Sequence, residues 1–316
     1  MQGVILAAGR GSRLHPLTLA RSKAMLPVLG QPIVARVVDL LAEQGIADFV
    51  LVISPEDRDI ERYFRQATPP EVDVRFVYQP ERRGMADALR YAAPLITGDF
   101  VLSACDNLVT PADVARLLDF WQRERPAGLL TVMPVEPARL GSVGIVELEG
   151  PWVQRIVEKP APEDAPSRIC SLPLYIFTAQ LLDYLPQLAP SPRGEYELQD
   201  AIQLLIAATG RVGSVEIARR LTLTSAADLL ALNREYLLHG SEQPQLAPQT
   251  VGPDTRLITP LRIEPGTVIG AGCTIGPNVY IERDCAIGAG VTLRDAVVLR
   301  GAELPANSTY TGQVVA

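Results

Sequence analysis

The feature that most restricts how this chain folds is a run of aliphatic residues at a strict interval of six toward its end. The aliphatic positions are Val251, Leu257, Ile263, Ile269, Ile275, Ile281, Ile287, Leu293 and Leu299. Glycine follows the aliphatic residue at Gly252, Gly270, Gly276 and Gly288, where a chain must turn a corner. A fixed short period of this kind predicts a solenoid whose stacked coils bury one continuous aliphatic core.

The hexad period resembles that of left-handed parallel β-helices, in which three hexads make one triangular coil. On that pattern the hexads of this chain give about three coils. A solenoid this short needs a neighbour or a cap for its open end. We therefore expect residues 241–316 to form a small β-helix domain, and we assign this domain to the assembly of a homo-oligomer.

Strand-like apolar runs alternate with helix-length patterns over the first part of the chain. The runs are Gly3 to Ala8, Phe49 to Ile53, Val72 to Tyr78, Phe100 to Ala104 and Leu129 to Val135. The helical patterns are Ile33 to Gln44, Asp57 to Gln66, Met85 to Leu95 and Pro111 to Arg123. This alternation predicts an α/β fold: a Rossmann-like mixed, mainly parallel sheet with helices on both faces and ligands at the carboxyl ends of its strands.

Further strand-like and helical segments precede the hexads. The strand-like segments are Ile145 to Leu148, Trp152 to Val157 and Leu174 to Phe177; the helical ones are Gln180 to Leu188, Leu198 to Ala208 and Ala226 to Leu238. Ser225 and Asp228 stand at the spacing of a capping box. The stretch 240–250, rich in Gln, Pro and Ser, indicates a linker. Two domains are thus expected, residues 1–240 and residues 241–316.

The composition excludes several classes of protein. No apolar run reaches the roughly 18 to 20 residues that cross a bilayer, so we expect no membrane partner and a location in the cytoplasm. The net charge of -7 argues against a nucleic-acid partner, since such binding needs a basic face. The only histidines, His15 and His239, are too few to build a metal site from histidine side chains. The cysteines form no C-x-x-C pair and are expected to be reduced.

The start of the chain departs from this acidic average. No Asp or Glu occurs from Met1 to Val38, although several arginines and one lysine do. Only two of the 29 basic residues of the whole chain are lysines, Lys23 and Lys159. A tight phosphate pocket can require a compact ammonium and reject the wide arginine fork, so both lysines are candidates for phosphate binding.

The first strand runs into a glycine-containing loop, Leu6-Ala7-Ala8-Gly9-Arg10-Gly11-Ser12-Arg13-Leu14. Glycines after a strand let backbone amides approach phosphate, while Arg13 and Lys23 supply positive charge. The loop is no Walker loop, because no G-x-x-x-x-G-K-[ST] occurs. It is no dinucleotide fingerprint either, because Leu14 replaces the third glycine and no acidic residue follows about 20 positions on. A tight turn with surface arginines is the alternative to a polyanion site.

The string from Leu6 to Val28 resembles the signature of the sugar-phosphate nucleotidyltransferase family, L-A-A-G-x-G-[ST]-R-L-x-P-L-T followed by P-K-x-[ML]-[LV]-P-[VI]. Four further blocks resemble the family in order, at residues 79–89, 105–107, 158–160 and 192–202. Ser22 departs from the usual proline before the lysine, and Val143 from the tyrosine often found before Gly144. The stretch Pro190 to Glu195 resembles that of glucose-1-phosphate thymidylyltransferases of the longer type, which carry a C-terminal left-handed β-helix.

The resemblance implies a nucleoside triphosphate and a sugar 1-phosphate as substrates and Mg²⁺ as cofactor. It implies catalytic roles for Arg13, Lys23 and Lys159, nucleotide binding by Leu6, Ala8, Gly9, Gly11, Gln79 and Gly84, sugar binding by Gly144, Glu158 and Glu195, and metal binding by Asp106 and Asp200. A glutamine amide both donates and accepts hydrogen bonds, so Gln79 favours thymine or uracil as the base.

The chemistry of the residues agrees with these roles. Carboxylates that converge from distant parts of a chain, such as Asp106 and Asp200, can hold a hard cation against triphosphate oxygens. Taken singly, each is better explained as a structural residue, Asp106 in a turn and Asp200 at a helix start. In the expected reaction an ionised oxygen of the sugar phosphate attacks the α-phosphorus in line and pyrophosphate leaves, so no protein nucleophile is needed.

Three other functions stay open. A β-helix that also transfers acyl groups would rely on a histidine base, and none occurs from Val251 to Ala316. A catalytically silent regulatory subunit that binds nucleotide sugars would usually lack a metal carboxylate or a phosphate lysine, whereas this chain has both. Uridylyl transfer is the near alternative to thymidylyl transfer, and guanylyl or adenylyl transfer depends on loop geometry.

Overall fold

The computed structural model describes residues 1–239 and 251–316. Contacts divide the chain into two compact units, Met1–Gly9 with Val34–Arg220 and Arg10–Ile33 with Leu221–Ala316. The expected boundary after residue 240 and the expected linker at 240–250 lie outside the described residues. The structure differs from the expected division in one respect: Arg10–Ile33, which we call the signature segment, groups with the C-terminal unit.

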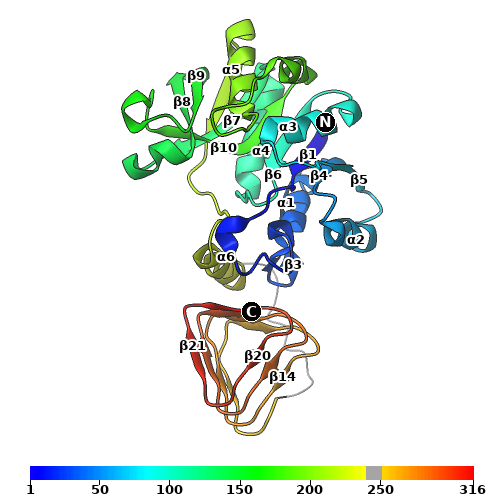
Figure 1. The fold of residues 1–316 in the computed structure, drawn as a ribbon, viewed down its shortest axis with the longest axis vertical. Helices are drawn as coiled ribbons and strands as arrows, with labels where there is room; N and C mark the ends of the chain where they lie inside the picture. The colour runs from blue at the N-terminus through cyan, green and yellow to red at the C-terminus, as the bar shows by residue number, and fades with distance from the viewer. Residues whose placement is uncertain (240–250) are drawn as a thin grey trace. The chain divides into compact units, whose positions relative to one another are not determined.

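The first unit is built on one nine-stranded sheet in the order β5-β4-β1-β6-β10-β7-β11-β9-β8 (Figure 1). Its strands are β1 (Gln2–Leu6), β4 (Asp48–Ile53), β5 (Asp73–Tyr78), β6 (Phe100–Ala104), β7 (Gly128–Pro134), β8 (Gly144–Glu149), β9 (Trp152–Glu158), β10 (Ile169–Phe177) and β11 (Val212–Glu216). The mixed α/β class is confirmed. The expected mixed sheet with predominantly parallel strands is found: β5, β4, β1 and β6 pair in parallel, as do β7 and β11, whereas β10 runs antiparallel to both β6 and β7.

Two strands differ from the sequence prediction. Strand β11 was not expected, because Val212–Glu216 is short and contains Gly213; its place between β7 and β9 makes it a strand. Strand β10 begins at Ile169 rather than Leu174, and its pairing with β7 is irregular between Leu172 and Tyr175. Pro173 lies in that gap and cannot donate to the ladder.

Helices cover both faces of the sheet. They are α1 (Ile33–Ala42), α2 (Arg58–Ala67), α3 (Met85–Ala92), α4 (Pro111–Glu124) and α5 (Leu198–Thr209). Helices α3 and α5 share one buried cluster with Leu102 and Leu130 of the sheet. Phe120 of α4 lies against Gly213 and Leu129, on the other face. The stretch expected as a helix at 180–188 is the 3₁₀ helix η6 (Ala179–Gln187), since Pro186 inside it removes a backbone donor.

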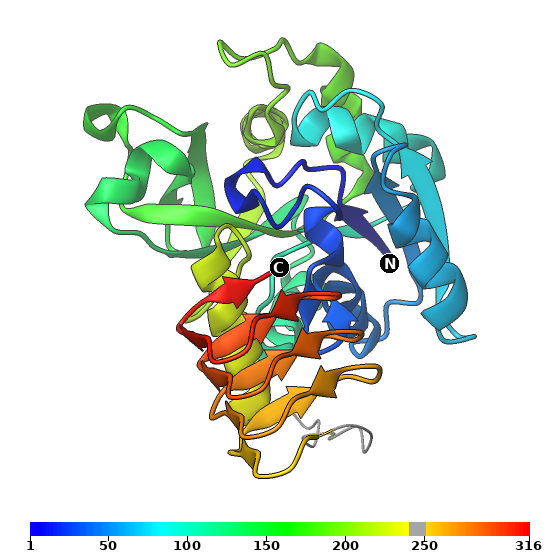
Figure 2. The ribbon, with the colours of Figure 1, turned by 60° about the horizontal axis from the view of Figure 1, so that its bottom comes forward.

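The hexad region forms three parallel stacks of short strands, β12-β15-β18-β21, β13-β16-β19-β22 and β14-β17-β20. Their bounds are β12 (Arg256–Leu257), β13 (Leu261–Ile263), β14 (Val268–Ile269), β15 (Thr274–Ile275), β16 (Val279–Ile281), β17 (Ala286–Ile287), β18 (Thr292–Arg294), β19 (Ala296–Val298), β20 (Glu303–Leu304), β21 (Thr309–Thr311) and β22 (Val314–Val315). Figure 2 shows the coils stacked one on another. The predicted parallel β-helix is confirmed, and its left-handed winding stays a prediction.

The register of the coils follows three hexads per turn and then slips by one residue. Leu257 pairs with Ile275, which pairs with Leu293. Ile281, however, pairs with Val298, and Val298 rather than Leu299 belongs to the aliphatic core. The expectation that Leu299 continues the inward series is therefore wrong, because the corner after Leu293 is one residue shorter than six-residue spacing requires.

Helix α6 (Ala226–His239) ties the signature segment to this unit. It packs on β19 and β22 and on β2 (Pro27–Val28), which pairs with β3 (Gln31–Pro32). Its buried Asn233 accepts from Leu29 N at 2.9 Å and donates to Pro27 O at 3.1 Å. The predicted capping box is confirmed, because Ser225 N donates to Asp228 Oδ2 and Asp228 N to Ser225 Oγ. Across residues 1–239 and 251–316, no helix has the length and apolar character that crossing a bilayer requires.

Candidate functional site

The carboxyl ends of β1, β4, β5 and β6 meet at one edge of the sheet, because these strands are parallel. The loop after β1 begins there: Leu6 O accepts from Cys105 N at 3.1 Å, and Ala8 O accepts from Arg82 Nε at 2.7 Å. A Cβ added to Gly9 would meet no atom within 4 Å. Open space above Gly9 is what a ligand approaching the backbone requires.

Gln79 directly follows β5 at this edge and is buried, with 3% of its surface exposed. Its Nε2 donates to Asp87 Oδ2 at 2.8 Å and to Gly84 O at 3.3 Å. Both hydrogens of Nε2 are therefore bonded within the protein. Only Oε1 is left to form a hydrogen bond with a base. Recognition of a pyrimidine by Gln79 stays a prediction.

Gly84 precedes α3 in a backbone conformation that other residues rarely adopt, with φ of 100°. A Cβ there would lie 2.5 Å from Tyr196 O. Tyr196 N donates to Arg83 O at 2.7 Å, and Ala86 N donates to Tyr196 O at 3.1 Å. The predicted nucleotide loop and the chain beside the predicted sugar residue Glu195 are thus held together by backbone hydrogen bonds.

Gly144 and Glu158 pair across the β8–β9 ladder, as two predicted sugar-binding residues should. A Cβ on Gly144 would lie 3.0 Å from both Glu158 Oε2 and Ser171 Oγ and 3.3 Å from Gln199 Cγ. A larger residue at position 144 would therefore push these side chains aside by a few tenths of an ångström. The sequence analysis missed Ser171 and Gln199, although Gln199 lies inside a block that resembles the family.

Glu158 is the most unusual charged group of this cluster. Only 12% of its side chain is exposed; Oε1 lies 3.1 Å from Lys159 Nζ, and Oε2 is buried without a hydrogen-bond partner. Burial raises the pKa of Glu158, although the charge of Lys159 opposes the rise. Lys159 itself has a φ of 45°, in the left-handed region that costs a lysine energy. Strain and unpaired polar atoms together mark a functional site.

Asp106 lies just after β6 and is 5% exposed. Its neighbour Asn107 is 1% exposed, and neither end of its amide has a hydrogen-bond partner. Burial lowers the pKa of Arg220, and the negative charge of Asp106 is the largest opposing influence. A buried guanidinium therefore acts on the predicted metal carboxylate. The sequence analysis assigned no role to Asn107 and gave no signal for Arg220, one arginine among many.

Asp200 lies in the first turn of α5 and is exposed. Partial burial raises its pKa, the charge of Glu197 adds to the rise, and Arg193 opposes it. Among residues 1–239 and 251–316, no group of three or more His, Cys, Asp or Glu side chains is gathered to hold a metal ion. The predicted pairing of Asp106 with Asp200 around a metal stays a prediction.

The remaining predicted residues, Gly11, Arg13 and Lys23, lie in the signature segment of the second unit. Thr18 Oγ1 donates to Gly11 O at 2.9 Å, and a Cβ on Gly11 would lie 2.8 Å from Lys23 Cβ. Arg13 lies in the 3₁₀ turn η1 (Ser12–Leu14), and Lys23 opens η2 (Lys23–Met25). The segment is thus folded on itself, so that the predicted glycine loop and the predicted lysine lie in contact.

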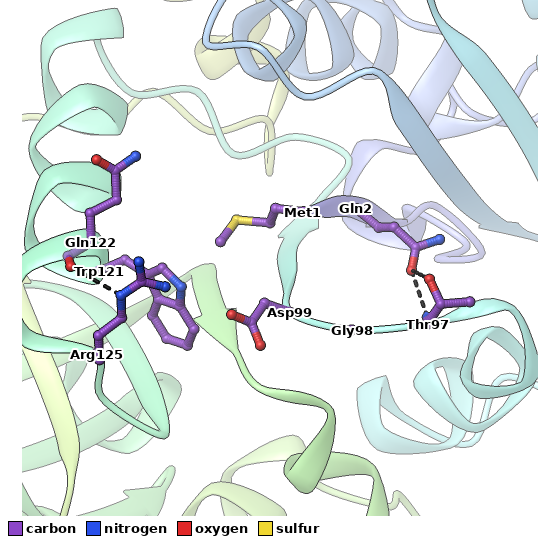
Figure 3. Close-up of a pocket in the computed structure, with 8 residues that line it drawn as sticks. All are labelled: Met1, Gln2, Thr97, Gly98, Asp99, Trp121, Gln122 and Arg125. Carbon is purple, nitrogen blue, oxygen red and sulfur yellow. Dashed lines mark hydrogen bonds between the residues drawn. The ribbon is translucent and has the colours of Figure 1, made fainter.

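A hollow of about 700 Å³ lies at the other edge of the sheet, where β1 and β6 begin (Figure 3). Asp99, Trp121, Gln122 and Arg125 are among the residues that line it. Arg125 Nε donates to Gln122 O at 3.1 Å across its rim. Ligands of open α/β sheets bind at the carboxyl ends of parallel strands, so this hollow is not the candidate site.

Comparison with known protein families agrees with this geometry. The family model described as "Nucleotidyl transferase" matches residues 2–219. This chain belongs to that family. A second model, described as "GMPPB C-terminal domain", matches residues 257–316, which cover most of the β-helix. The resemblance to sugar-phosphate nucleotidyltransferases seen in the signature blocks is confirmed.

Several proteins with an assigned function are similar in sequence to this nucleotidyl transferase. A UTP–glucose-1-phosphate uridylyltransferase of Streptococcus pneumoniae is 30% identical over 237 residues, which is 65% of this chain and 79% of that protein. The UTP–glucose-1-phosphate uridylyltransferase AglF of Haloferax volcanii is 30% identical over 69% of this chain and 88% of its own length.

Solved structures show the same fold. A UTP-bound UGPase from Acinetobacter baumannii aligns with a TM-score of 0.68 at 24% identity, over 76% of this chain and 94% of that one. A UDP-glucose pyrophosphorylase complexed with UDP-glucose aligns with a TM-score of 0.67 at 21% identity, over 74% and 97%. The nucleotidyl transferase thus shares its α/β architecture with these structures.

Proposed function

We propose that this nucleotidyl transferase joins a nucleoside triphosphate to a sugar 1-phosphate and releases pyrophosphate and a nucleotide sugar. The observation that carries the proposal is the state of Glu158, whose Oε2 is buried without a partner next to Gly144 while Oε1 faces Lys159. A buried polar atom left unpaired costs about 1–3 kcal/mol. Sugar hydroxyls donate hydrogen bonds and would satisfy this oxygen, while the adjacent ammonium suits the phosphate on the same sugar.

The sugar half of the proposed site is built around Glu158 and Gly144. Gly144 leaves room for the sugar ring, and the orphaned amide of Asn107 offers a donor and an acceptor for further hydroxyls. Lys159 binds the phosphate as a point charge. Glu195 is proposed to add a further sugar contact from the loop that Tyr196 holds against α3.

The nucleotide half is proposed to form along the carboxyl-end edge of β1 and β5. Leu6, Ala8 and Gly9 present the backbone, Gln79 Oε1 accepts from the base, and Gly84 lets the chain turn beside it. For Gly11, Arg13 and Lys23 the proposal rests on their charge and backbone and on the family to which the chain belongs. The positive charges of Arg13 and Lys23 neutralise the triphosphate.

The sugar phosphate needs no general base, since its oxygen is already ionised when it attacks the α-phosphorus. Lys159 orients the attacking phosphate, and the glycine loop with Arg13 and Lys23 stabilises the charge that builds on the phosphoryl oxygens and on the departing pyrophosphate. The protein residues therefore contribute position and charge, and no covalent intermediate with the enzyme forms.

Enzymes of this family generally use a divalent metal ion. Mg²⁺ typically takes one or two carboxylates and completes its shell with water and substrate phosphates, so Asp106 at the sheet edge fits as a protein ligand. Asp200 is proposed as the second. When bound, the ion withdraws charge from the phosphate oxygens.

The preferred substrates are proposed to be glucose 1-phosphate and dTTP or UTP. Two curated relatives are named as uridylyltransferases of glucose 1-phosphate, and Gln79 Oε1 can accept from the imino group of thymine or uracil. Pyrophosphate release by the purified chain, with four triphosphates against the 1-phosphates of glucose, mannose, galactose and N-acetylglucosamine, with and without Mg²⁺, tests this. Absence of release with every pair would refute the proposed function.

One observation favours a second candidate, a catalytically silent subunit that binds nucleotide sugars. The negative charge of Asp106 acts on the buried cation of Arg220, so a metal ion would have to share this carboxylate with Arg220. Calorimetric binding of UDP-glucose by a chain that releases no pyrophosphate would establish this alternative. Turnover by the purified chain alone would exclude it.

We also propose a homo-oligomer that forms through the β-helix, because the edge strands of its first and last coils have no further coil to pair with among the described residues. Light scattering after size exclusion tests this; a monomer at all concentrations would contradict it. A location in the cytoplasm is part of the same proposal.

A further inference from the structure

We propose that Glu282 of the β-helix is a positioning residue for the reaction, because it anchors the signature segment through Arg21. The inference rests on the proposed function, which gives Arg13 and Lys23 of that segment the task of neutralising the triphosphate. It assigns to the β-helix a part in turnover in addition to assembly.

The contact between the two residues is close and largely shielded from solvent. Arg21 Nη1 donates to Glu282 Oε1 at 2.9 Å and to Oε2 at 3.0 Å. The side chains are 20% and 11% exposed. Charge-assisted hydrogen bonds of this kind are stronger than neutral ones, and partial burial protects the pair from screening by salt.

Glu282 is itself fixed by the coils and not by the segment. It directly follows β16, and its backbone N donates to Val298 O at 2.8 Å on the next coil. Its Oε2 also accepts from Arg300 N at 2.7 Å. The carboxylate therefore serves two donors at once, the backbone of the β-helix and Arg21, which makes it a rigid anchor.

Arg21 lies two residues before Lys23, so the anchor acts close to the proposed phosphate lysine. Lys23 in turn packs against Gly11, whose carbonyl is bound by Thr18. These contacts connect Arg21 to the glycine loop and to the short turn that carries Arg13. A shift of Arg21 would therefore move the charged groups of the segment together.

The other flank of Lys23 is anchored as well. Asn233 of α6 holds Leu29 and Pro27 through its side-chain amide. Gly30 lies against the side chains of Arg262 and Glu264, which form an ion pair on the first coils. Lys23 thus stands between two attachments, one to Glu282 and one to α6 and the neighbouring coil.

The expected consequence is a loss of rate and not of fold. A misplacement of about 1 Å in a positioned group can lower turnover by about a hundredfold. Glutamine at position 282 has no negative charge and replaces one of the two acceptor oxygens with an NH2 group that cannot accept from Arg21 or Arg300 N. We expect E282Q to lower kcat about tenfold, since one attachment of the segment remains, and to change KM for the sugar phosphate less than about twofold.

The experiment compares E282Q, R21Q and the double variant R21Q/E282Q in the full chain. Asp284 provides the matched control, because D284N removes a carboxylate two positions away that pairs with the Arg300 side chain at 3.6 Å. Steady-state kcat and KM are measured for both substrates. Hydrogen exchange by mass spectrometry follows peptides from residues 10–33 and from the β-helix.

If Glu282 acts through Arg21, both single variants and the double variant share one reduced kcat, because losses along one interaction are not additive. Exchange then speeds up in residues 10–33, while β-helix peptides and D284N behave as wild type. Multiplied losses in the double variant, or E282Q with wild-type kcat and exchange, would overturn the inference. Should the wild-type chain release no pyrophosphate, the proposed function fails, and the exchange pattern alone decides whether Glu282 anchors the segment.

Discussion

The corners of the β-helix and the end of β9 both hold residues other than glycine in the left-handed backbone region, yet the two places differ in the residues they use. In the β-helix these residues are Asp254, Asn278, Asp284, Asp295 and Asn307. Their short polar side chains tolerate this conformation. At the end of β9 the residue is Lys159, which has no such tolerance. The repeat uses residues that suit this backbone, whereas the end of β9 holds a residue that does not, at a position where we propose that an ammonium binds phosphate.

Buried polar atoms differ between the two regions in the same way. In the β-helix the thiols of Cys273 and Cys285 donate to backbone carbonyls at 3.3 and 3.1 Å. Near β6 and β9, Asn107 and Glu158 keep buried polar atoms without partners. Tyr280 is the exception in the β-helix, since its buried hydroxyl has no partner within the repeat and lies against the backbone of Gly30 in the signature segment. Polar atoms of the repeat are thus mostly satisfied by the repeat itself.

The largest effect is expected from removing the negative charge of Asp106 at the carboxyl-end edge of the sheet. D106N should lower kcat by about a hundred- to a thousandfold, as loss of one charge-stabilising group does. The variant should still fold but with a lower Tm, because the buried cation of Arg220 loses the negative charge of Asp106. Pyrophosphate release and circular dichroism measure the two effects. D99N, at the opposite edge, is the control, and unchanged turnover in D106N would remove Asp106 from the site.

A cavity in the repeat should instead cost stability. Ile275 is fully buried between Leu257 and Leu293, so I275A should destabilise the β-helix by about 2–4 kcal/mol. Hydrogen exchange of β-helix peptides gives this free energy separately from the other unit. V268A is the control, since Val268 is 51% exposed. Equal hydrogen exchange of β-helix peptides in I275A and V268A would show that the buried aliphatic core does not stabilise the coils.

Replacement of Lys159, whose backbone is strained, tests whether the proposed site needs an ammonium group or only a positive charge. K159R keeps the charge but replaces a point charge with a planar fork, so KM for the sugar 1-phosphate should rise about tenfold with little change in Tm. The same exchange in reverse at an exposed position of β9, R155K, is the control. Wild-type KM in K159R would show that the ammonium does not bind the phosphate.

The smallest effect is expected for the stability of E158Q. Because burial raises the pKa of Glu158 in the folded state, the protonated form is favoured, and stability is lost as pH rises through that pKa. Glutamine stays neutral, so E158Q should have a Tm about 1–3 °C higher at pH 8 and no gain at pH 4. Thermal melts across pH test the sign. An E158Q protein that is less stable at pH 8 would contradict burial as the dominant influence.

The β-helix was predictable because its pairing depends on a local period. Each aliphatic residue meets the one three hexads away, so the spacing alone identified Ile275 and Ile281 as core residues. The prediction failed at Leu299 because the spacing of aliphatic residues does not show how many residues a corner contains. The corner at Asp295 has one residue fewer, so Val298 takes the inward position. Strand β11 was missed for the opposite reason, since its sequence is a poor strand and only its neighbours β7 and β9 make it one.

The candidate site was predictable only in part. The resemblance to the family identified Gly144 and Glu158, and the β8–β9 ladder does pair them. Ser171 and Gln199 could not be predicted, because they reach Gly144 from β10 and α5 through the tertiary packing. Arg220 near Asp106 could not be predicted either, since nothing local distinguishes it from other arginines.

The sequence by itself determined the elements whose causes are local: the hexad coils, the strand and helix alternation, the capping box of α6 and the family blocks. The tertiary structure alone decided that the signature segment groups with the β-helix, because the ion pair of Arg21 and Glu282 joins residues 261 positions apart. Periodicity reports how a segment pairs with its near neighbours. An ion pair between distant segments depends on where the whole chain places two single side chains, and no local pattern encodes that.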